Sequence, residues 1–312
     1  MSKKHLITAA TSDPRALLAL LRARLGVSEA EARRAVREGS VWIDGRRAVP
    51  TVNTVSAGQK VTVFVAETSS PIPRPQVVYE DRDLLVVNKP AGLLCQPGRR
   101  GGPSLLTMLP GPLWLPHRLD GETSGLTMLA RSAEVCARLG QALVEGRIER
   151  RYLARVVGVP EASGRIDLRI GKSAGQGAPR MRAYPTESTV GDSAVSHFWC
   201  LDTLHPACGA QSLVLVRLET GRTHQIRAHM KHIGHPLFND SAYGGDRILK
   251  GTIFNKYRQF VENCFEIMPR QALHAKSLGF IHPATRKFVH FETELPADFH
   301  AVLEKWRNYI KE

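Results

Sequence analysis

The sequence predicts an α+β protein of two domains, and three observations point to this fold class. Strand-like and helical runs follow one another without the regular alternation of a doubly wound α/β protein. A segment rich in serine and proline, residues 67–76, cannot hold a regular helix or a central strand. The chain of 312 residues is long enough for one small and one large domain. We therefore expect domains at residues 1–66 and 77–312, joined by a linker at 67–76.

Two short helices and a strand hairpin are predicted for the first domain. Leucines recur at helical spacing up to Gly26, and a capping box at Ser28 starts a second helix. Strand-forming residues at 41–43 are followed by an Asp-Gly pair at 44–45, which is typical of a tight hairpin turn. A further strand is predicted at 61–65.

The second domain carries strand and helix signals in irregular order. The predicted strands lie at 84–87, 152–157 and 213–218, and the predicted helices lie at 132–145 and 223–233. In the second of these helices, Ile226, Met230 and Ile233 form an apolar stripe that is expected to be buried. An α+β domain fits this order better than a doubly wound one.

Charge is the first feature that indicates a partner. The chain has 43 Lys and Arg residues against 29 Asp and Glu residues, which gives a net charge of +14. Residues 1–65 hold 11 of these cations against five acidic residues, a net charge of +6. Such a surface favours polyanions, although a basic surface that serves only solubility would give the same count.

The helix, helix and hairpin at residues 14–65 resemble an S4 domain, the RNA-binding module of ribosomal protein S4 and of several RNA-modifying enzymes. On the second predicted helix, Arg33, Arg34 and Arg37 are spaced so that two or three guanidinium groups project from one face. We expect these arginines to bind RNA phosphates, and a solvated basic face is the alternative.

Neither a membrane segment nor a disulfide framework is indicated. The N-terminus lacks the apolar run of a signal peptide, and no stretch of about 18 apolar residues occurs. The five cysteines are scattered and odd in number, so we expect reduced thiols and a cytoplasmic protein. Residue types that bind zinc occur at His197, Cys200, His205 and Cys208. Structural zinc sites usually separate their ligand pairs by about a dozen residues, so we predict no metal and interpret these side chains as packing residues.

The candidate site residues lie in three dense segments, at 77–98, 116–131 and 218–245. Asp120 is followed by Gly-Glu-Thr-Ser-Gly and an apolar run, a pattern that fits a simple turn residue and a catalytic carboxylate equally well. Arg222 lies where a strand passes into a helix, a common place for site residues, although an ordinary surface charge fits as well. An arginine aimed at a carboxylate would hold it ionised and oriented.

These segments resemble the RluA-type family of pseudouridine synthases. The motifs that carry the resemblance are H-R-L-D-x-x-T-S-G at 117–125, N-K-P-A-G at 88–92, G-R-T-H-Q-I-R at 221–227 and R-Q-A-L-H-A at 270–275. Together they cover about residues 75–300 of the chain. The resemblance implies the pseudouridine synthase fold, a mixed, largely antiparallel sheet flanked by helices and loops.

The resemblance also implies roles for individual residues. It makes Asp120 the catalytic aspartate, Arg222 its ion-pair partner and Tyr152 the active-site tyrosine. We expect Arg118 to fill the space that a flipped nucleotide leaves or to bind its phosphate, and a structural salt bridge is the alternative. The other predicted RNA contacts within the motifs are Thr123 and His224.

The reaction of this family needs no metal, nucleotide or redox cofactor. The N1–C1′ bond of a uridine breaks, the uracil turns while it is held, and C5 bonds to C1′. Asp120 would act as a nucleophile at C1′ or C6, or as a base at C2′, on a uridine flipped out of the RNA stack. The expected partner is RNA, first large-subunit ribosomal RNA and second tRNA, bound by a monomer without membrane contact. A non-catalytic RNA-binding or ribosome-assembly factor is the alternative from another class.

Overall fold

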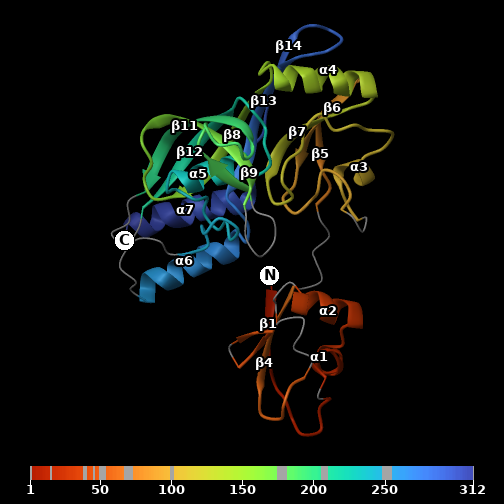
Figure 1. Ribbon diagram of the computed structural model, residues 1–312, viewed down its shortest axis with the longest axis vertical. Helices are drawn as coiled ribbons and strands as arrows, with labels where there is room; N and C mark the ends of the chain where they lie inside the picture. Colours follow the sequence, from red (N-terminus) through yellow and green to blue (C-terminus); the bar gives the residue numbers. More distant parts are fainter. Residues whose placement is uncertain are drawn as a thin grey trace. The chain divides into compact units, whose positions relative to one another are not determined.

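A computed structural model divides the chain into two compact units, Met1–Pro71 and Ile72–Glu312 (Figure 1). The structure describes residues 2–14, 16–37, 41–44, 46–48, 54–66, 73–98, 102–173, 181–204, 210–247 and 255–311. The division between the units falls within the serine- and proline-rich segment 67–76.

The first unit is an antiparallel sheet with two helices. Its elements are β1 (Ser2–Thr8), α1 (Leu17–Leu25), α2 (Glu29–Arg37), β2 (Val41–Ile43), β3 (Arg46–Arg47) and β4 (Lys60–Ala66). The strands lie in the order β1-β4-β2-β3. Leu17, Leu20 and Leu21 of α1 are buried with Val61 and Val63 of β4. The sequence did not predict β1, which pairs with β4 along its whole length.

The second unit is built on a ten-stranded sheet in the order β10-β9-β11-β12-β8-β13-β7-β6-β5, with β14 beside β13. Its strands are β5 (Gln76–Glu80), β6 (Leu84–Lys89), β7 (Ser124–Ala130), β8 (Glu149–Val157), β9 (Ser163–Lys172), β10 (Met181–Tyr184), β11 (Asp192–Leu204), β12 (Gln211–Leu218), β13 (Leu273–Ile281) and β14 (Phe288–Glu292). Every described strand pair is antiparallel except β13 with β7. The predicted mixed, largely antiparallel sheet is confirmed.

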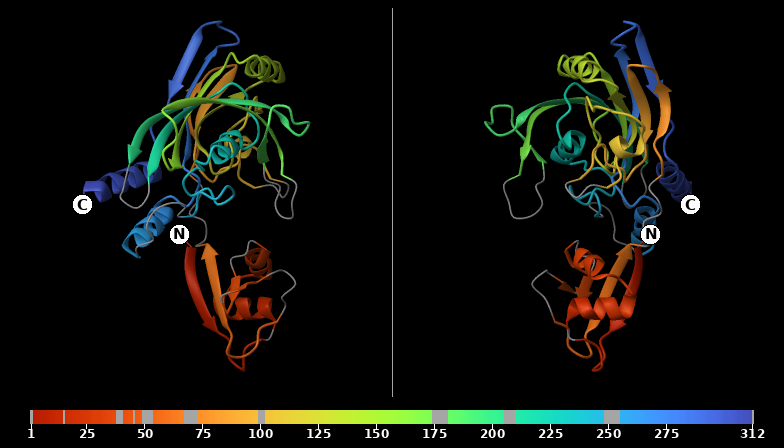
Figure 2. Two further views of the ribbon diagram at one scale, coloured as in Figure 1. Left: turned by 60° about the vertical axis from the view of Figure 1, so that its left-hand side comes forward. Right: turned by 90° about the vertical axis from the view of Figure 1, so that its right-hand side faces the viewer.

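Helices cover both faces of one half of this sheet (Figure 2). The helices of the unit are α3 (Leu105–Met108), α4 (Ala133–Val144), α5 (Gln225–His232), α6 (Asn255–Ile267) and α7 (Ala297–Lys311). Adjacent residues of a strand point to opposite faces. Val214 of β12 therefore belongs to the buried cluster that includes Ile226 and Met230 of α5, whereas Leu213 packs against the cluster that includes Trp306 of α7.

The turn at Asp120 leads directly into β7, a buried strand. The start of β7 is held by its contact with β13. Ser124 and Gly125 pair in parallel with His274 and Ala275, and Ser124 Oγ lies 3.0 Å from His274 Nδ1. A Cβ atom at Gly125 would lie 2.3 Å from the carbonyl oxygen of Ala275, and φ there is 109°. Only glycine fits this conformation and this contact.

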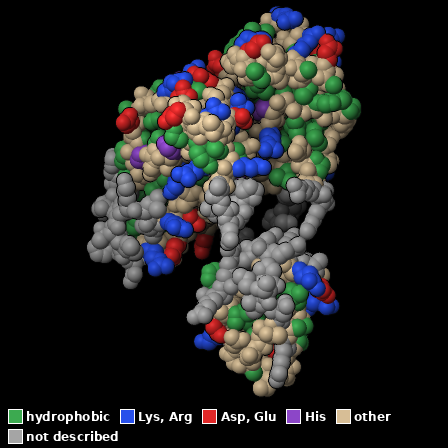
Figure 3. Space-filling model, viewed as in Figure 1, with side chains coloured by type: hydrophobic (Ala, Val, Ile, Leu, Met, Phe, Trp, Pro, Cys, Tyr) green, Lys and Arg blue, Asp and Glu red, His purple; other side chains and the backbone are tan. Residues whose placement is uncertain are grey.

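The surface and the cysteines of the described part add three observations. The described helices lack the combination of length and apolar character that crossing a bilayer requires. Lys and Arg side chains form a loose band across the face of the second unit seen in Figure 3. The described cysteines, Cys95, Cys136, Cys200 and Cys264, are free. His197 and Cys200 lie on β11, where His197 pairs with Glu219, while His205 and Cys208 lie outside the described residues.

Gly125→Ala is expected to lower the free energy of unfolding by about 2–4 kcal/mol, because it adds overpacking to a left-handed backbone. Gly140→Ala is the matched control, since Gly140 lies in α4 with nothing within 4 Å of the added Cβ. Alanine there should stabilise the helix by about 1 kcal/mol. Urea unfolding measures both values, and equal stability of the two variants would contradict the close approach of β7 and β13.

Candidate active site

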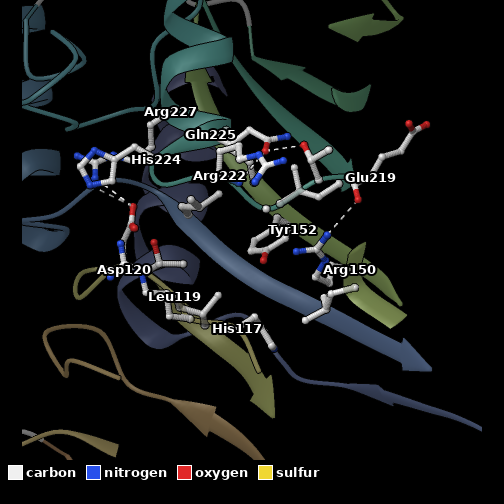
Figure 4. Close-up of a pocket in the computed structure, with 18 of the residues that line it drawn as sticks. His117, Leu119, Asp120, Arg150, Tyr152, Glu219, Arg222, His224, Gln225 and Arg227 are labelled. Carbon is white, nitrogen blue, oxygen red and sulfur yellow. Dashed lines mark hydrogen bonds and ion pairs between the residues drawn. The ribbon is translucent and has the colours of Figure 1, made fainter. Parts of the chain in front are cut away.

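A cavity of about 340 Å³ opens beside the turn that carries Asp120 (Figure 4). It is lined by residues 116–120 and Thr123, by side chains of β8, and by residues 218–222 and 224–227 where β12 passes into α5. Part of α4 and Leu273 complete the lining. Its volume is that of a small-ligand site. The predicted site residues that line it are Asp120, Tyr152, Arg222, Arg118, Thr123 and His224.

Two buried cations hold the turn that begins at Asp120. Nζ of Lys89, which is fully buried, donates to three backbone carbonyl oxygens, among them that of Gly121 at 2.8 Å. Nη1 of Arg270 donates to the carbonyl oxygen of Glu122 at 3.1 Å. Burial lowers the pKa of Lys89 to about 8. Since a buried charge needs hydrogen-bond acceptors, these cations and the turn stabilise one another.

The ion-pair partner of Asp120 is Arg227, and the expected pairing with Arg222 is corrected. Nη1 of Arg227 lies 3.1 Å from Oδ2 of Asp120, while its Nε and Nη2 bind both oxygens of Asp240 at 2.7 and 2.9 Å. Nε of Arg222 donates instead to the carbonyl oxygen of Ser193 at 3.0 Å.

Helix geometry explains the correction. Arg227 lies three residues after His224, so both side chains leave the same face of the helix start towards Asp120. Arg222 precedes the helix and reaches back to β11. Burial disfavours the charged form of Arg227, but the hydrogen bonds and charge of Asp240 outweigh this effect, so the pKa of Arg227 is raised.

His224 faces the carboxylate from the start of α5. It is the N-cap residue, with a left-handed backbone at φ 55°, and its Nε2 lies 3.7 Å from Oδ2 of Asp120 (Figure 4). Its Nδ1 lies 3.0 Å from the hydroxyl oxygen of Tyr243. Burial is the largest influence on His224 and lowers its pKa, against the opposing effect of the Asp120 charge. The Tyr243 ring also covers the guanidinium of Arg227, 5.0 Å from its centroid.

Tyr152 and Arg150 reach the cavity from one face of β8, because they are two residues apart on a strand. Tyr152 is buried, and burial raises its pKa. Nη2 of Arg150 donates to the carbonyl oxygen of Glu219 at 3.3 Å. A Cβ atom at Gly221 would lie 2.6 Å from Nη1 of Arg150, so the glycine leaves room for this guanidinium.

The predicted RNA contacts fall into different environments. Arg118 is exposed and Nη2 donates to the hydroxyl of Thr223 at 3.1 Å, which is a hydrogen bond and not the salt bridge considered as the alternative. Thr123 is buried, and its N–H donates to the carbonyl oxygen of Asp120 at 3.1 Å. Its hydroxyl lies 3.4 Å from Nε2 of Gln271. Thr123 therefore closes the turn at the wall of the cavity, and its contact with RNA stays a prediction.

The arginines of α2 belong to the first unit. Arg33 is exposed and pairs with Glu29 at 2.7 Å, one helical turn away. The side chains of Arg34 and Arg37 lie outside the described residues.

Sequence reasoning missed the residues that support Asp120. Arg227 and Lys89 lie within the motifs that carry the family resemblance. Arg227 lies three residues after His224, and this helical spacing was the available signal that the two side chains point the same way. Asp240 and Tyr243 lie in the loop after α5, where no periodic pattern shows direction. Their contacts with Arg227 and His224 became visible only in the folded chain.

The sequence of the chain is similar to that of a known enzyme family. The family model described as RNA pseudouridylate synthase matches residues 83–232. The chain is 38% identical over 238 residues to the ribosomal large subunit pseudouridine synthase D of Pseudomonas aeruginosa, covering 72% of this chain and 69% of that protein. It is 34% identical over 292 residues to the protein of the same name from Vibrio vulnificus, covering 88% and 85%.

Solved structures show the same fold. Human RNA pseudouridylate synthase domain containing 1 superposes with a TM-score of 0.56 at 25% identity, covering 79% of this chain and 98% of that one. Human RNA pseudouridylate synthase domain containing 4 superposes with a TM-score of 0.59 at 23% identity, covering 74% and 93%, and this likeness concerns the fold alone. From the sequence relatives and the fold together, the chain belongs to the RluA-type family of RNA pseudouridine synthases.

Proposed function

We propose that this enzyme converts uridines of large-subunit ribosomal RNA to pseudouridine, with Asp120 as the catalytic carboxylate. The observation that carries the proposal is a carboxylate paired with Arg227 in one cavity with Tyr152. The names of the Pseudomonas and Vibrio relatives support ribosomal RNA over tRNA as the substrate.

The side chains around the cavity suit an isomerisation within one nucleotide. The reaction breaks N1–C1′ and forms C5–C1′, so every non-hydrogen atom of the uridine stays in the product. Arg227 orients the carboxylate of Asp120 through a charge-assisted hydrogen bond, which prepares it to act on the sugar or the base. The buried ring of Tyr152 offers a surface against which a flipped uracil packs. Arg118, exposed at the cavity, would bind the phosphate of that nucleotide or fill the space it leaves.

A second cavity, of about 490 Å³, offers room for neighbouring nucleotides. Its described lining includes Arg182, Lys231, His232 and Arg247 and no acidic residue. Tyr243 lines it too and contacts His224 of the first cavity, so the two cavities share a wall. In our proposal the RNA backbone follows this basic side.

The first unit serves in our proposal as an S4-like RNA-binding domain, with residues 67–76 as its linker. Its helices α1 and α2 precede β2, β3 and β4, the order expected for such a module, and β1 is an addition before them. Arg33 is exposed, and its ion pair with Glu29 contributes little because solvent screens both charges. An RNA phosphate would compete readily for this guanidinium.

Asp120→Asn is expected to abolish pseudouridine formation while leaving the fold and RNA binding in place, because the amide cannot act as a nucleophile or base. The measurement is release of tritium from 5-tritiated uridine in ribosomal RNA, with circular dichroism and filter binding as controls. Turnover by the variant would refute the role of Asp120. A wild-type enzyme that releases no tritium from any RNA would favour the non-catalytic RNA-binding factor.

Arg227→Lys is expected to lower kcat about 100-fold, because lysine retains one charge near Asp240 but cannot bridge two carboxylates. Arg222→Lys is the matched control and should change kcat little, since its side chain bonds a backbone carbonyl. Single-turnover rates on ribosomal RNA compare the two, and thermal unfolding checks that both variants fold. A larger loss in Arg222→Lys would restore Arg222 as the functional partner.

Lys231→Ala and Arg247→Ala should each weaken RNA binding and reduce the slope of log K against log salt by about 1, because each removes one phosphate contact. Lys287→Ala is the control, since Lys287 is exposed and lines neither cavity. Binding titrations between about 50 and 200 mM salt measure the slopes. Unchanged slopes in the first two variants would exclude the second cavity from the RNA path.

A further inference from the structure

The last step of pseudouridine formation requires a base at C5, a role that the proposed function gives to no residue. When C5 bonds to C1′, C5 still carries its hydrogen, and the product forms only after that proton leaves. We propose that Nε2 of His224 takes the proton from C5. This inference rests on the proposed function and names a second catalytic residue for the same site.

The proton transfer balances without any co-reactant other than water. The C5–H bond breaks and its electron pair forms the C5=C6 double bond. The electrons of the C6=N1 double bond pass to N1, which takes a proton from water. The imidazolium of His224 then returns its proton to water, so the net change moves one proton from C5 to N1.

A hydrogen bond fixes the tautomer of His224. The hydroxyl of Tyr243 donates to the carbonyl oxygen of Met181 at 3.0 Å, because that oxygen only accepts. The hydroxyl oxygen must therefore accept its contact with His224, 3.0 Å away, from Nδ1–H. Burial raises the pKa of Tyr243 to about 12, so the hydroxyl stays protonated. Neutral His224 consequently has its free lone pair on Nε2, the atom that faces Asp120.

The charged groups around His224 suit a base that works near neutral pH. Those that act on it are Asp120 and Arg118 from the turn, Arg227 from α5 and Asp240 from the following loop. The lowered pKa of His224 keeps the imidazole neutral before the reaction. Once His224 is protonated, the carboxylate of Asp120, 3.7 Å away, stabilises the imidazolium.

His117, Tyr152 and Glu219 also line the cavity, and they are worse bases. Nε2 of His117 lies within hydrogen-bond distance of the N–H of Met128, and burial lowers the pKa of His117 to about 3. Tyr152 is protonated, since burial raises its pKa. Glu219 is paired with His197.

His224→Asn tests the proposal, because asparagine tolerates a left-handed backbone but cannot take the proton. Pseudouridine formation in ribosomal RNA is measured with uridine that carries hydrogen or deuterium at C5. We expect kcat to fall about 100-fold or more, RNA affinity to be unchanged, and a primary deuterium isotope effect larger than in the wild type. The wild-type rate should also fall with decreasing pH. This acidic limb should lie below the ordinary imidazole pKa of about 6.5, because burial lowers the pKa of His224, and it should be absent in the variant.

Tyr243→Phe is the matched variant, since it keeps a ring over Arg227 and removes only the hydroxyl that fixes the tautomer. Its isotope effect should lie between those of the wild type and His224→Asn. A loss of kcat in His224→Asn without a larger isotope effect would show a structural role and overturn the proposal, as would an unchanged acidic limb. A wild-type enzyme that forms no pseudouridine would overturn the proposed function, and this inference with it.

Discussion

Buried positive charge holds the irregular turn that carries the reactive carboxylate. Lys89 and Arg270 donate to the carbonyl oxygens of Gly121 and Glu122, and Arg227 donates to Asp120 itself. A turn has no ladder of backbone hydrogen bonds to hold it, whereas a buried cation must find acceptors. The cations supply hydrogen-bond donors to the turn, and the turn supplies acceptors to the cations. The Asp120 carboxylate is therefore positioned before any substrate arrives.

The same turn depends on the one parallel contact in the described sheet. β7 begins at Ser124, directly after the turn, and meets β13 at His274. Gly125 permits the close approach, and the Ser124–His274 hydrogen bond ties together two motifs that lie 150 residues apart in the sequence. The sheet therefore brings the motifs at 117–125 and 270–275 into one structural unit around the cavity.

Contacts behind Arg227 and His224 connect the Asp120 carboxylate to the wall of the basic cavity. Asp240 and Tyr243 follow α5 and hold Arg227 and His224 by hydrogen bonds and ring contact. Tyr243 also forms part of the wall of the basic cavity. In the proposed function, the RNA backbone binds on one side of this wall. The other side of the wall orients Arg227 and His224 towards Asp120.

Local patterns in the sequence determined the α+β class and the helices and strands of regular period, because spacing is a local property. The resemblance of the sequence motifs to a known family supplied the candidates Asp120 and Tyr152. Only the tertiary structure decided which arginine reaches the carboxylate. Arg222 and Arg227 stand five residues apart in one motif, and the choice depends on where α5 begins and on Asp240 behind it. The role of Lys89 was equally hidden, since its acceptor at Gly121 comes from another segment of the chain. Side-chain direction and contacts between distant segments exist only after the chain has folded.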